Sequence, residues 1–284
     1  MTFNGLRKVL INWVPHWLRR MVRASIHAYN ARQARILALR EPSLHWELSS
    51  QAAPFSDRSP ANDLERYFAA NTGRLLNKWS HYFSVYDRHF ARYRGTDVHI
   101  LEFGVSHGGS LQMWKDYFGP RAKIYGVDIN PACQALEEDQ VKIFIGDQSS
   151  RRFLRSLVAS VPRVDILIDD GGHTMRQQVT TFEEMFAHVE ADGVYLCEDI
   201  HTSYWKRFGG GYQRRGTFIE YAKRLIDRLN AWHSEQPHWL SVDDFTRSAA
   251  SLHFYDSIFV VEKQPMPRPS HQQRGNPVPG IEPL

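Results

Sequence analysis

Residues 165–173 read D-I-L-I-D-D-G-G-H, and residues 193–199 read G-V-Y-L-C-E-D. Each segment holds a short apolar run that ends in two acids. Apolar runs bounded by Gly and Asp are typical of strands buried in a parallel sheet. Ligands of such sheets bind beyond the carboxyl ends of the strands. We therefore expect the four acids to meet at one crevice, with His173 beside them: Asp169, Asp170, Glu198 and Asp199.

Four carboxylates in one crevice repel one another unless something offsets their charge. The offset can be shared protons, a bound cation, or both. Carboxylate oxygens are hard ligands and favour Mg²⁺ or a similar divalent ion. The alternative to a functional site is that each acidic pair caps the helix that follows its strand, as acids at strand ends commonly do. That interpretation is sufficient for either pair taken alone. Two pairs on successive strands, with a histidine beside one of them, favour a functional site.

A glycine-rich loop follows the first expected strand. Residues 98–104 read V-H-I-L-E-F-G, then come V-S-H-G-G-S and a helical segment at 111–118. Small residues between a strand and a helix let backbone N–H groups approach a ligand closely. No Lys-Ser/Thr follows, as it would in a nucleoside triphosphatase, and Ser106 stands where G-x-G-x-x-G has its middle glycine. By itself this loop is a weak signal.

The next two strands strengthen the signal. The second, residues 122–129, carries Asp128 near its end, 24 residues after Gly104. An acid there is placed to accept the ribose hydroxyls of an adenosine ligand. The third, residues 141–145, is followed by Asp147 and Gln148, whose side chains are placed to meet an adenine edge.

Strand and helix patterns alternate five times, which predicts an α/β fold with a Rossmann-like, doubly wound sheet. Two later strands, 252–255 and 258–262, are separated by only two residues. So short a link requires an antiparallel pair. We expect a mostly parallel sheet with an antiparallel C-terminal hairpin, as in class I methyltransferases.

With these residues laid out, the chain resembles the class I S-adenosylmethionine-dependent methyltransferases. More narrowly, it resembles the metal-dependent O-methyltransferases of macrolide sugars, the mycinamicin and macrocin type. The resemblance covers roughly residues 71–263. Its most specific segments are L-E-F-G-V-S-H-G-G-S-L-Q-M-W, Y-G-V-D-I, I-D-D-G-G-H, C-E-D-I-H-T-S-Y-W and H-F-Y-D-S. The family often has Ser where Gly172 stands and another glycine at Ser106.

The resemblance implies S-adenosyl-L-methionine and Mg²⁺ as cofactors and a sugar hydroxyl, on a glycan or glycosylated natural product, as the acceptor. In that family the acid of D-G-x-H and the E-D pair hold the metal, which maps onto Asp170, Glu198 and Asp199. The histidine of D-G-x-H is the base, which maps onto His173. The residues expected at the methyl donor are Glu102, Gly104, Ser106, Gly108, Ser110, Asp128, Asp147, Gln148 and Asp169.

Other functions remain open from the residues. A catechol-type O-methyltransferase also uses an acidic metal site, with planar aromatic acceptors. An Fe(II) hydroxylase needs two histidines at the metal, whereas this crevice presents mainly carboxylates. A non-catalytic binder is possible for any Rossmann-like chain. A nucleic-acid partner is not expected, because the basic residues are concentrated outside the expected catalytic domain.

The charge distribution and composition divide the chain. The net charge is +4 over 284 residues, yet residues 1–40 hold eight Lys or Arg and no acid. We expect a basic helical arm and linker at 1–59, a methyltransferase domain at 60–263 and a Pro-rich irregular tail at 264–284. The arm either packs on the domain or on a second subunit, or lies on an anionic membrane surface. Two cysteines without metal or redox spacing fit a cytoplasmic setting.

Residues 200–216 combine aromatic side chains, cations and three consecutive glycines. One interpretation is a mobile loop that closes over an acceptor. The other is an ordinary long connection.

Overall fold

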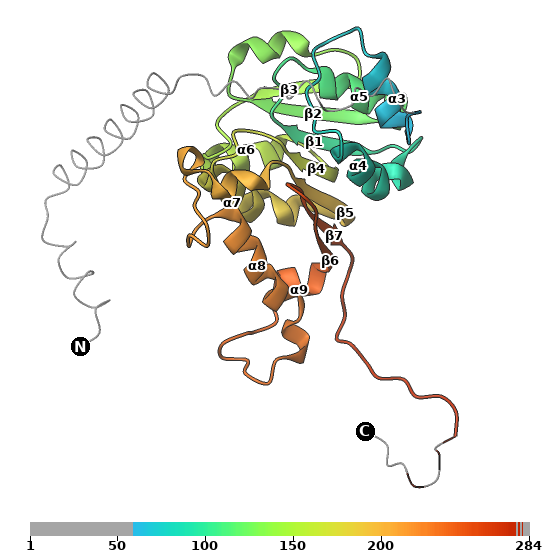
Figure 1. The fold of residues 1–284 in the computed structure, drawn as a ribbon, viewed down its shortest axis with the longest axis vertical. Helices are drawn as coiled ribbons and strands as arrows, with labels where there is room; N and C mark the ends of the chain where they lie inside the picture. The colour runs from blue at the N-terminus through green and yellow to red at the C-terminus, as the bar shows by residue number, and fades with distance from the viewer. Residues whose placement is uncertain (1–58, 277, 279, 281–284) are drawn as a thin grey trace, which may run out of the picture. The chain divides into compact units, whose positions relative to one another are not determined.

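A seven-stranded sheet with the order β3-β2-β1-β4-β5-β7-β6 organises the part of the chain that this computed structural model describes, residues 59–276, 278 and 280 (Figure 1). The strands are β1 (His99–Phe103), β2 (Lys123–Asp128), β3 (Val141–Ile145), β4 (Val164–Asp169), β5 (Val189–Cys197), β6 (Ala249–Phe254) and β7 (Phe259–Lys263). The order reverses between β1 and β4, and ligands bind at such a reversal in doubly wound folds.

The sheet has the expected mixture of directions. Neighbouring strands from β3 to β5 pair in parallel, whereas β7 runs antiparallel to both β5 and β6. Every residue of β1 and β4 is buried, as strands covered on both faces require. The predicted α/β fold with an antiparallel C-terminal hairpin is confirmed.

The described helices are α3 (Asp63–Ala70), α4 (Tyr82–Phe90), α5 (Gly109–Phe118), α6 (Arg151–Ser160), α7 (Met175–Met185), α8 (Phe218–Leu229) and α9 (Asp244–Ser248). Short 3₁₀ segments are η2 (Ala91–Tyr93), η3 (Pro131–Leu136), η4 (Phe186–His188), η5 (Ile200–Tyr204), η6 (Lys206–Phe208) and η7 (Ala231–His233).

Helices cover both faces of the sheet. Helices α6 and α7 lie on one side and α4 and α5 on the other (Figure 1). On the first side, side chains of β1 and β4 pack with Leu154 of α6 and Phe182 of α7. On the second, the Tyr86 ring of α4 meets Trp114 of α5 edge-on, 5.3 Å between centroids. The aromatic residues of α4, Tyr82, Phe83, Tyr86 and Phe90, are all buried in this core.

Polar caps fix where the helices over the site begin. Thr174 and Gln177 form a capping box at the start of α7, so the N-cap of this helix directly follows His173. Thr217 caps α8 by accepting from the backbone N–H of Glu220. These caps set the position of the loop between β5 and α8 relative to the sheet.

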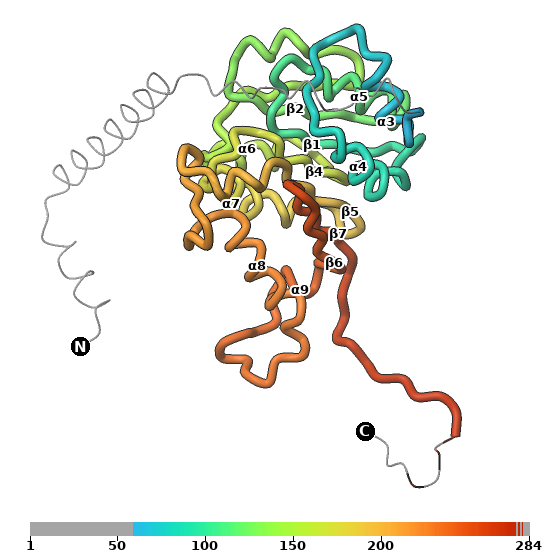
Figure 2. Tube along the Cα trace, viewed as in Figure 1, coloured from blue at the N-terminus to red at the C-terminus, as the bar shows by residue number. Residues whose placement is uncertain are grey.

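After β7 the chain leaves the sheet, and residues 264–276 contain no helix or strand (Figure 2). None of the described helices has the length and apolar character needed to cross a bilayer. The basic arm, with its expected membrane or subunit contact, falls on residues 1–58, outside the described part of the chain.

Candidate active site

A cavity of about 430 Å³ opens at the carboxyl ends of the parallel strands. It brings together most of the residues that the sequence selects: Gly104, Ser106, Ser110, Asp128, Asp147, Gln148, Asp170, His173 and Asp199. The remaining selected residues, Glu102, Gly108, Asp169 and Glu198, are not part of its lining. The cavity has two functional regions. We call Gly104, Ser106, Ser110, Asp128 and Gln148 the donor half, and Asp170, His173, Glu198 and Asp199 the carboxylate centre.

The donor half begins at Gly104, directly after β1. Its φ is +95°, and a Cβ there would overlap the backbone carbonyl of Asp170. The backbone N–H of Asp170 donates to the carbonyl of Phe103 at 3.0 Å. Only glycine allows this approach, so the residue couples the end of β1 to the acid that follows β4.

The carboxylate of Asp128 organises the glycine-rich loop. Its Oδ2 accepts hydrogen bonds from the backbone N–H groups of Val105 and Ser106, both at 3.0 Å. Its Oδ1 accepts from the N–H of Asn130 at 2.8 Å. Asp128 therefore shapes the loop as well as facing the cavity, and its remaining lone pairs are available to a ligand.

Glu102 and Asp169 lie beneath the donor half, where both are buried. Burial raises the pKa of each carboxyl to about 7. Glu102 accepts from the Ser110 hydroxyl at 2.9 Å. Asp169 accepts from the Gln148 amide and, at 3.2 Å, from the Tyr195 hydroxyl. These two acids thus act by positioning Ser110 and Gln148, which face the cavity.

Gly108 also lies outside the cavity lining. It is the N-cap residue of α5, with a φ of +75°. In that position it sets the turn from the loop into the helix.

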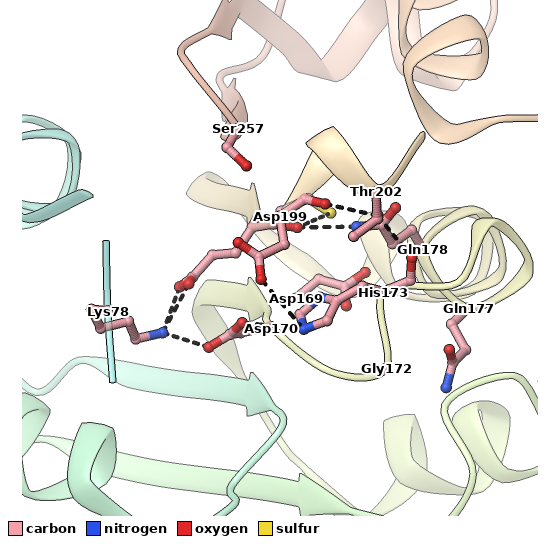
Figure 3. A network of polar contacts seen from close by, with 12 residues as sticks. Lys78, Asp169, Asp170, Gly172, His173, Gln177, Gln178, Asp199, Thr202 and Ser257 are labelled. Carbon is pink, nitrogen blue, oxygen red and sulfur yellow. Dashed lines mark hydrogen bonds and ion pairs between the residues drawn. The ribbon is translucent and has the colours of Figure 1, made fainter. Parts of the chain in front are cut away.

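In the carboxylate centre, the imidazole of His173 points toward two acids (Figure 3). Its Nε2 lies 3.6 Å from Asp199 Oδ2 and 3.9 Å from Asp170 Oδ1. One ligand atom from each residue lies within 4.8 Å of the others. The other ring nitrogen of His173, Nδ1, is buried with no hydrogen-bond partner in the described part of the chain. Two carboxylate oxygens therefore face a space that suits a divalent cation, and the imidazole of His173 lies beside it.

The backbone is unusual at two of these residues. His173 and Asp199 have φ values of +54° and +53°, a region that residues with side chains occupy infrequently. The hydroxyl of Thr202 lies 2.9 Å from the carbonyl oxygen of His173 and 2.8 Å from that of Asp199. The Gln178 amide donates to the carbonyl of Glu198 at 3.0 Å. The hydrogen bonds from Thr202 and Gln178 thus stabilise a backbone conformation that residues with side chains otherwise rarely adopt.

Lys78 supplies a positive charge that the sequence analysis missed. Its Nζ lies 2.5 Å from Asp170 Oδ2 and 2.9 Å from both oxygens of Glu198 (Figure 3). Although burial opposes the charged form, Asp170 and then Glu198 raise the pKa of Lys78 well above its ordinary value. The buried ammonium therefore stays charged and offsets part of the repulsion between these acids.

Two tyrosines of α4 complete this side of the centre. The Tyr86 hydroxyl donates to Glu198 Oε1 and the Tyr82 hydroxyl to Asp199 Oδ1, both at 2.7 Å. With Lys78 they recur at intervals of four residues in the aromatic-rich segment that precedes β1. Lys78 is the one lysine in the aromatic-rich segment 63–94. A lone lysine in such a segment indicates a charge that is paired when buried, and this signal could have identified Lys78.

The strand order, the glycine-rich loop and the acid at the end of β2 define a class I methyltransferase fold. No protein-family model matches the chain. The 8-demethyl-8-alpha-L-rhamnosyl tetracenomycin-C 2'-O-methyltransferase of Streptomyces olivaceus is 37% identical over 225 residues, covering 71% of this chain and 58% of its own. The mycinamicin VI 2''-O-methyltransferase of Micromonospora griseorubida is 37% identical over 211 residues, covering 70% and 51%.

A solved structure gives the same result. The MycE methyltransferase of the mycinamycin biosynthetic pathway, in complex with Mg, SAH and mycinamycin VI, is 35% identical. It superposes with a TM-score of 0.63 over 72% of this chain and 54% of its own. The chain belongs to the family of macrolide-sugar O-methyltransferases of the mycinamicin and macrocin type. It spans about half the length of the curated relatives it matches.

Proposed function

We propose that the protein is an S-adenosylmethionine-dependent, Mg²⁺-dependent O-methyltransferase that acts on a sugar hydroxyl of a glycan or glycosylated natural product. The observation that carries this proposal is the position of the carboxylate centre, which shares one cavity with the donor half. The names of the relatives support it, since those enzymes are sugar O-methyltransferases. The Mg and SAH in the MycE complex support the two cofactors.

In this proposal the donor half binds S-adenosylmethionine. Asp128 would accept the ribose hydroxyls, and Asp147 and Gln148 would lie at the adenine. The turn that carries Gly104, Ser106 and Ser110 would hold the amino-acid portion. We now assign Glu102, Gly108 and Asp169 supporting roles, because they lie beneath the cavity or outside its lining.

The carboxylate centre would hold Mg²⁺ through Asp170 and Asp199, whose oxygens face His173. Glu198 would be a third ligand of the ion, and its carboxylate would then lose its contact with Lys78. When bound, the ion would stabilise the negative charge that develops on the hydroxyl oxygen. Lys78 contributes permanent positive charge to the same acids, and Tyr82 and Tyr86 orient their carboxylates.

His173 would act as the base. Its Nε2 faces the carboxylate centre and is placed to take the proton of an acceptor hydroxyl held there. An imidazole suits this task near neutral pH, whereas a sugar hydroxyl alone is a very weak acid. Asp199 and Asp170 would stabilise the imidazolium that forms. A second histidine, His201, lies 3.9 Å from the other oxygen of Asp199, but its Nδ1 contacts Ser257. It is not part of the group formed by Asp170, His173 and Asp199. A centre made mainly of carboxylates favours methyl transfer over Fe(II) hydroxylation.

A donor-consumption assay tests the proposal. Mycinamicin VI, methyl rhamnoside and catechol would be supplied in turn as acceptors, each with Mg²⁺ or with EDTA. We expect methylation of a glycosylated acceptor that EDTA stops and Mg²⁺ restores. Methylation of catechol alone would support the catechol-type alternative, and metal-independent turnover would contradict the proposed centre.

We further propose three regions of the chain, with residues 1–59 as a basic arm, 60–263 as the methyltransferase domain and 264–284 as a tail. The protein would be located in the cytoplasm. Its arm would contact either a membrane surface or a second copy of the chain. Liposome sedimentation and size-exclusion chromatography of full-length protein and of a form lacking residues 1–40 separate these contacts. Equal liposome binding and equal size for both forms would exclude both.

A further inference from the structure

A second hollow lies close to His173 of the carboxylate centre. It has a volume of about 570 Å³ and lies between the start of α7, the loop that precedes α8, and α8 itself. Thr174, the residue after His173, is part of its wall. So is Phe208, whose ring centroid lies 6.5 Å from that of His173. The hollow therefore lies next to the proposed base, which itself lines the first cavity.

The hollow is lined by four arginines, and we call it the arginine hollow: Arg176, Arg214, Arg215 and Arg224. Within the described part of the chain, none of the four forms an ion pair with a carboxylate. Glu183 also lines the hollow, but it is already ion-paired with Arg151. The sequence between Asp199 and Glu220 contains no acid at all.

All four arginines are exposed, as are other arginines without an ion pair in the described part of the chain, such as Arg121 and Arg268. What distinguishes the four is that they surround one concavity, where their positive charges repel one another and a concave wall concentrates their potential. Arg214 donates to the carbonyl of Gly210 at 3.4 Å and Arg224 lies over the Tyr221 ring, and neither contact neutralises the charge. The first turn of α7 adds partial positive charge on the same side. An anion inside the hollow would relieve this repulsion.

We propose that the arginine hollow binds an oxyanion of the acceptor, so that the methylated sugar carries a neighbouring phosphate, diphosphate or carboxylate group. The proposal rests on the proposed function, because it concerns the acceptor side of the same site. Guanidinium groups match phosphate and carboxylate oxygens with paired, charge-assisted hydrogen bonds. A sugar phosphate, a diphosphate-linked glycan or an acidic sugar fits these requirements, and a neutral glycoside leaves the four charges unused.

Calorimetry with simple anions tests the hollow directly. Inorganic pyrophosphate and glucuronate would each be titrated into full-length, Mg²⁺-free protein saturated with S-adenosylhomocysteine, which occupies the donor half. The test variant is Arg214→Gln with Arg215→Gln. The control is Arg121→Gln with Arg268→Gln, which removes two other exposed arginines, one before β2 at the opposite edge of the sheet and one after β7.

We expect the wild type and the control to bind one of the anions with similar affinity, and more weakly as salt is added. The test variant should bind at least about 100-fold more weakly or not at all, since it removes two charge-assisted contacts. Binding of pyrophosphate alone would assign a phosphorylated acceptor, and binding of glucuronate alone an acidic sugar. Absence of binding by both anions, or equal loss in both double variants, would overturn the proposal.

The result is separable from the proposed function. If the hollow binds an anion but no sugar acceptor is methylated, the hollow stands and the methyltransferase proposal fails. If glycosides that carry a phosphate or carboxylate group are methylated equally well by the wild type and the test variant, the methyltransferase proposal stands and the hollow fails.

Discussion

The donor half and the arginine hollow both lie near His173 and are built by different means. The donor half consists of residues at or just after the ends of β1, β2 and β3, and its shape is fixed by backbone hydrogen bonds to Asp128. The hollow is formed by the first turn of α7, a loop and α8, with exposed arginines on its walls. The donor half thus provides a rigid site for a constant ligand, and the hollow provides adjustable contacts for a variable one.

Except for Glu198, the carboxylate centre lines the same cavity as the donor half, and its His173 lies next to the arginine hollow. Its acids come directly after β4 and β5, so the sheet positions them, whereas His173 starts the segment that leads into α7. Changes on either side should therefore affect different steps: donor binding on one side, acceptor chemistry on the other. Four substitutions test this separation.

The largest effect should come from His173→Ala. Loss of the base should lower turnover by roughly 10²–10⁴-fold and leave the affinity for S-adenosylhomocysteine unchanged, because His173 acts on the acceptor. Turnover and calorimetric donor binding would be measured together. The control is His107→Ala, which removes a histidine of the same cavity on the donor side. Near-normal turnover of His173→Ala would refute its assignment as the base.

Lys78→Met should have the next largest effect. Without the ammonium, Asp170 and Glu198 face each other uncompensated, so the free energy of unfolding should fall by about 3 kcal/mol in Mg²⁺-free buffer. Mg²⁺ should then stabilise the variant more than the wild type. Urea unfolding with and without Mg²⁺ measures both effects, with Lys142→Met as the surface control. Wild-type stability in both buffers would show that Lys78 does not balance these acids.

Glu102→Gln should reveal a pH dependence in the donor half. The folded carboxyl, with a pKa of about 7, holds a proton that the unfolded chain releases above its ordinary value of 4.5. Wild-type stability therefore falls as pH rises from about 4.5 to 7, by on the order of 2 kcal/mol, and the variant lacks this loss. The difference in melting temperature, Glu102→Gln minus wild type, should therefore be more positive at pH 8 than at pH 5. With Glu235→Gln as control, a constant difference would contradict the assignment.

Thr202→Val should have the smallest effect. The hydroxyl contacts the carbonyls of His173 and Asp199, so its loss should cost about 1 kcal/mol of stability and reduce turnover more than donor affinity. Thr96→Val is the control, because its hydroxyl contacts only the carbonyl of Tyr93 at 2.6 Å at an exposed site. Equal turnover in the two variants would show that the left-handed backbone does not depend on Thr202.

Features that depend on the ends of strands could be predicted from the sequence. Apolar runs located β4 and β5, and parallel pairing then placed Asp170 near Glu198 and Asp199. The antiparallel hairpin follows from the two residues between the expected strands 252–255 and 258–262, which correspond to β6 and β7. These inferences succeed because the direction of a strand determines which residues share an edge of the sheet.

Other features depend on contacts distant in sequence and were not predictable in this way. Lys78 reaches Glu198 across 120 positions of the chain. The inward direction of the Glu102 and Asp169 side chains depends on which strand face packs against a helix. The arginines of the hollow come from three separate segments, so no local spacing brings them together. In each case tertiary packing, rather than local pattern, decides the outcome.

The central claim is that the carboxylate centre binds a divalent cation next to the methyl donor. Calorimetric titration of Mg²⁺ into the full-length protein saturated with S-adenosylhomocysteine tests it most directly, in the wild type and in Asp170→Asn and Asp199→Asn. We predict one Mg²⁺ per chain in the wild type and binding at least tenfold weaker in each variant. Equal Mg²⁺ affinity in all three proteins, or no binding to the wild type, would contradict the claim.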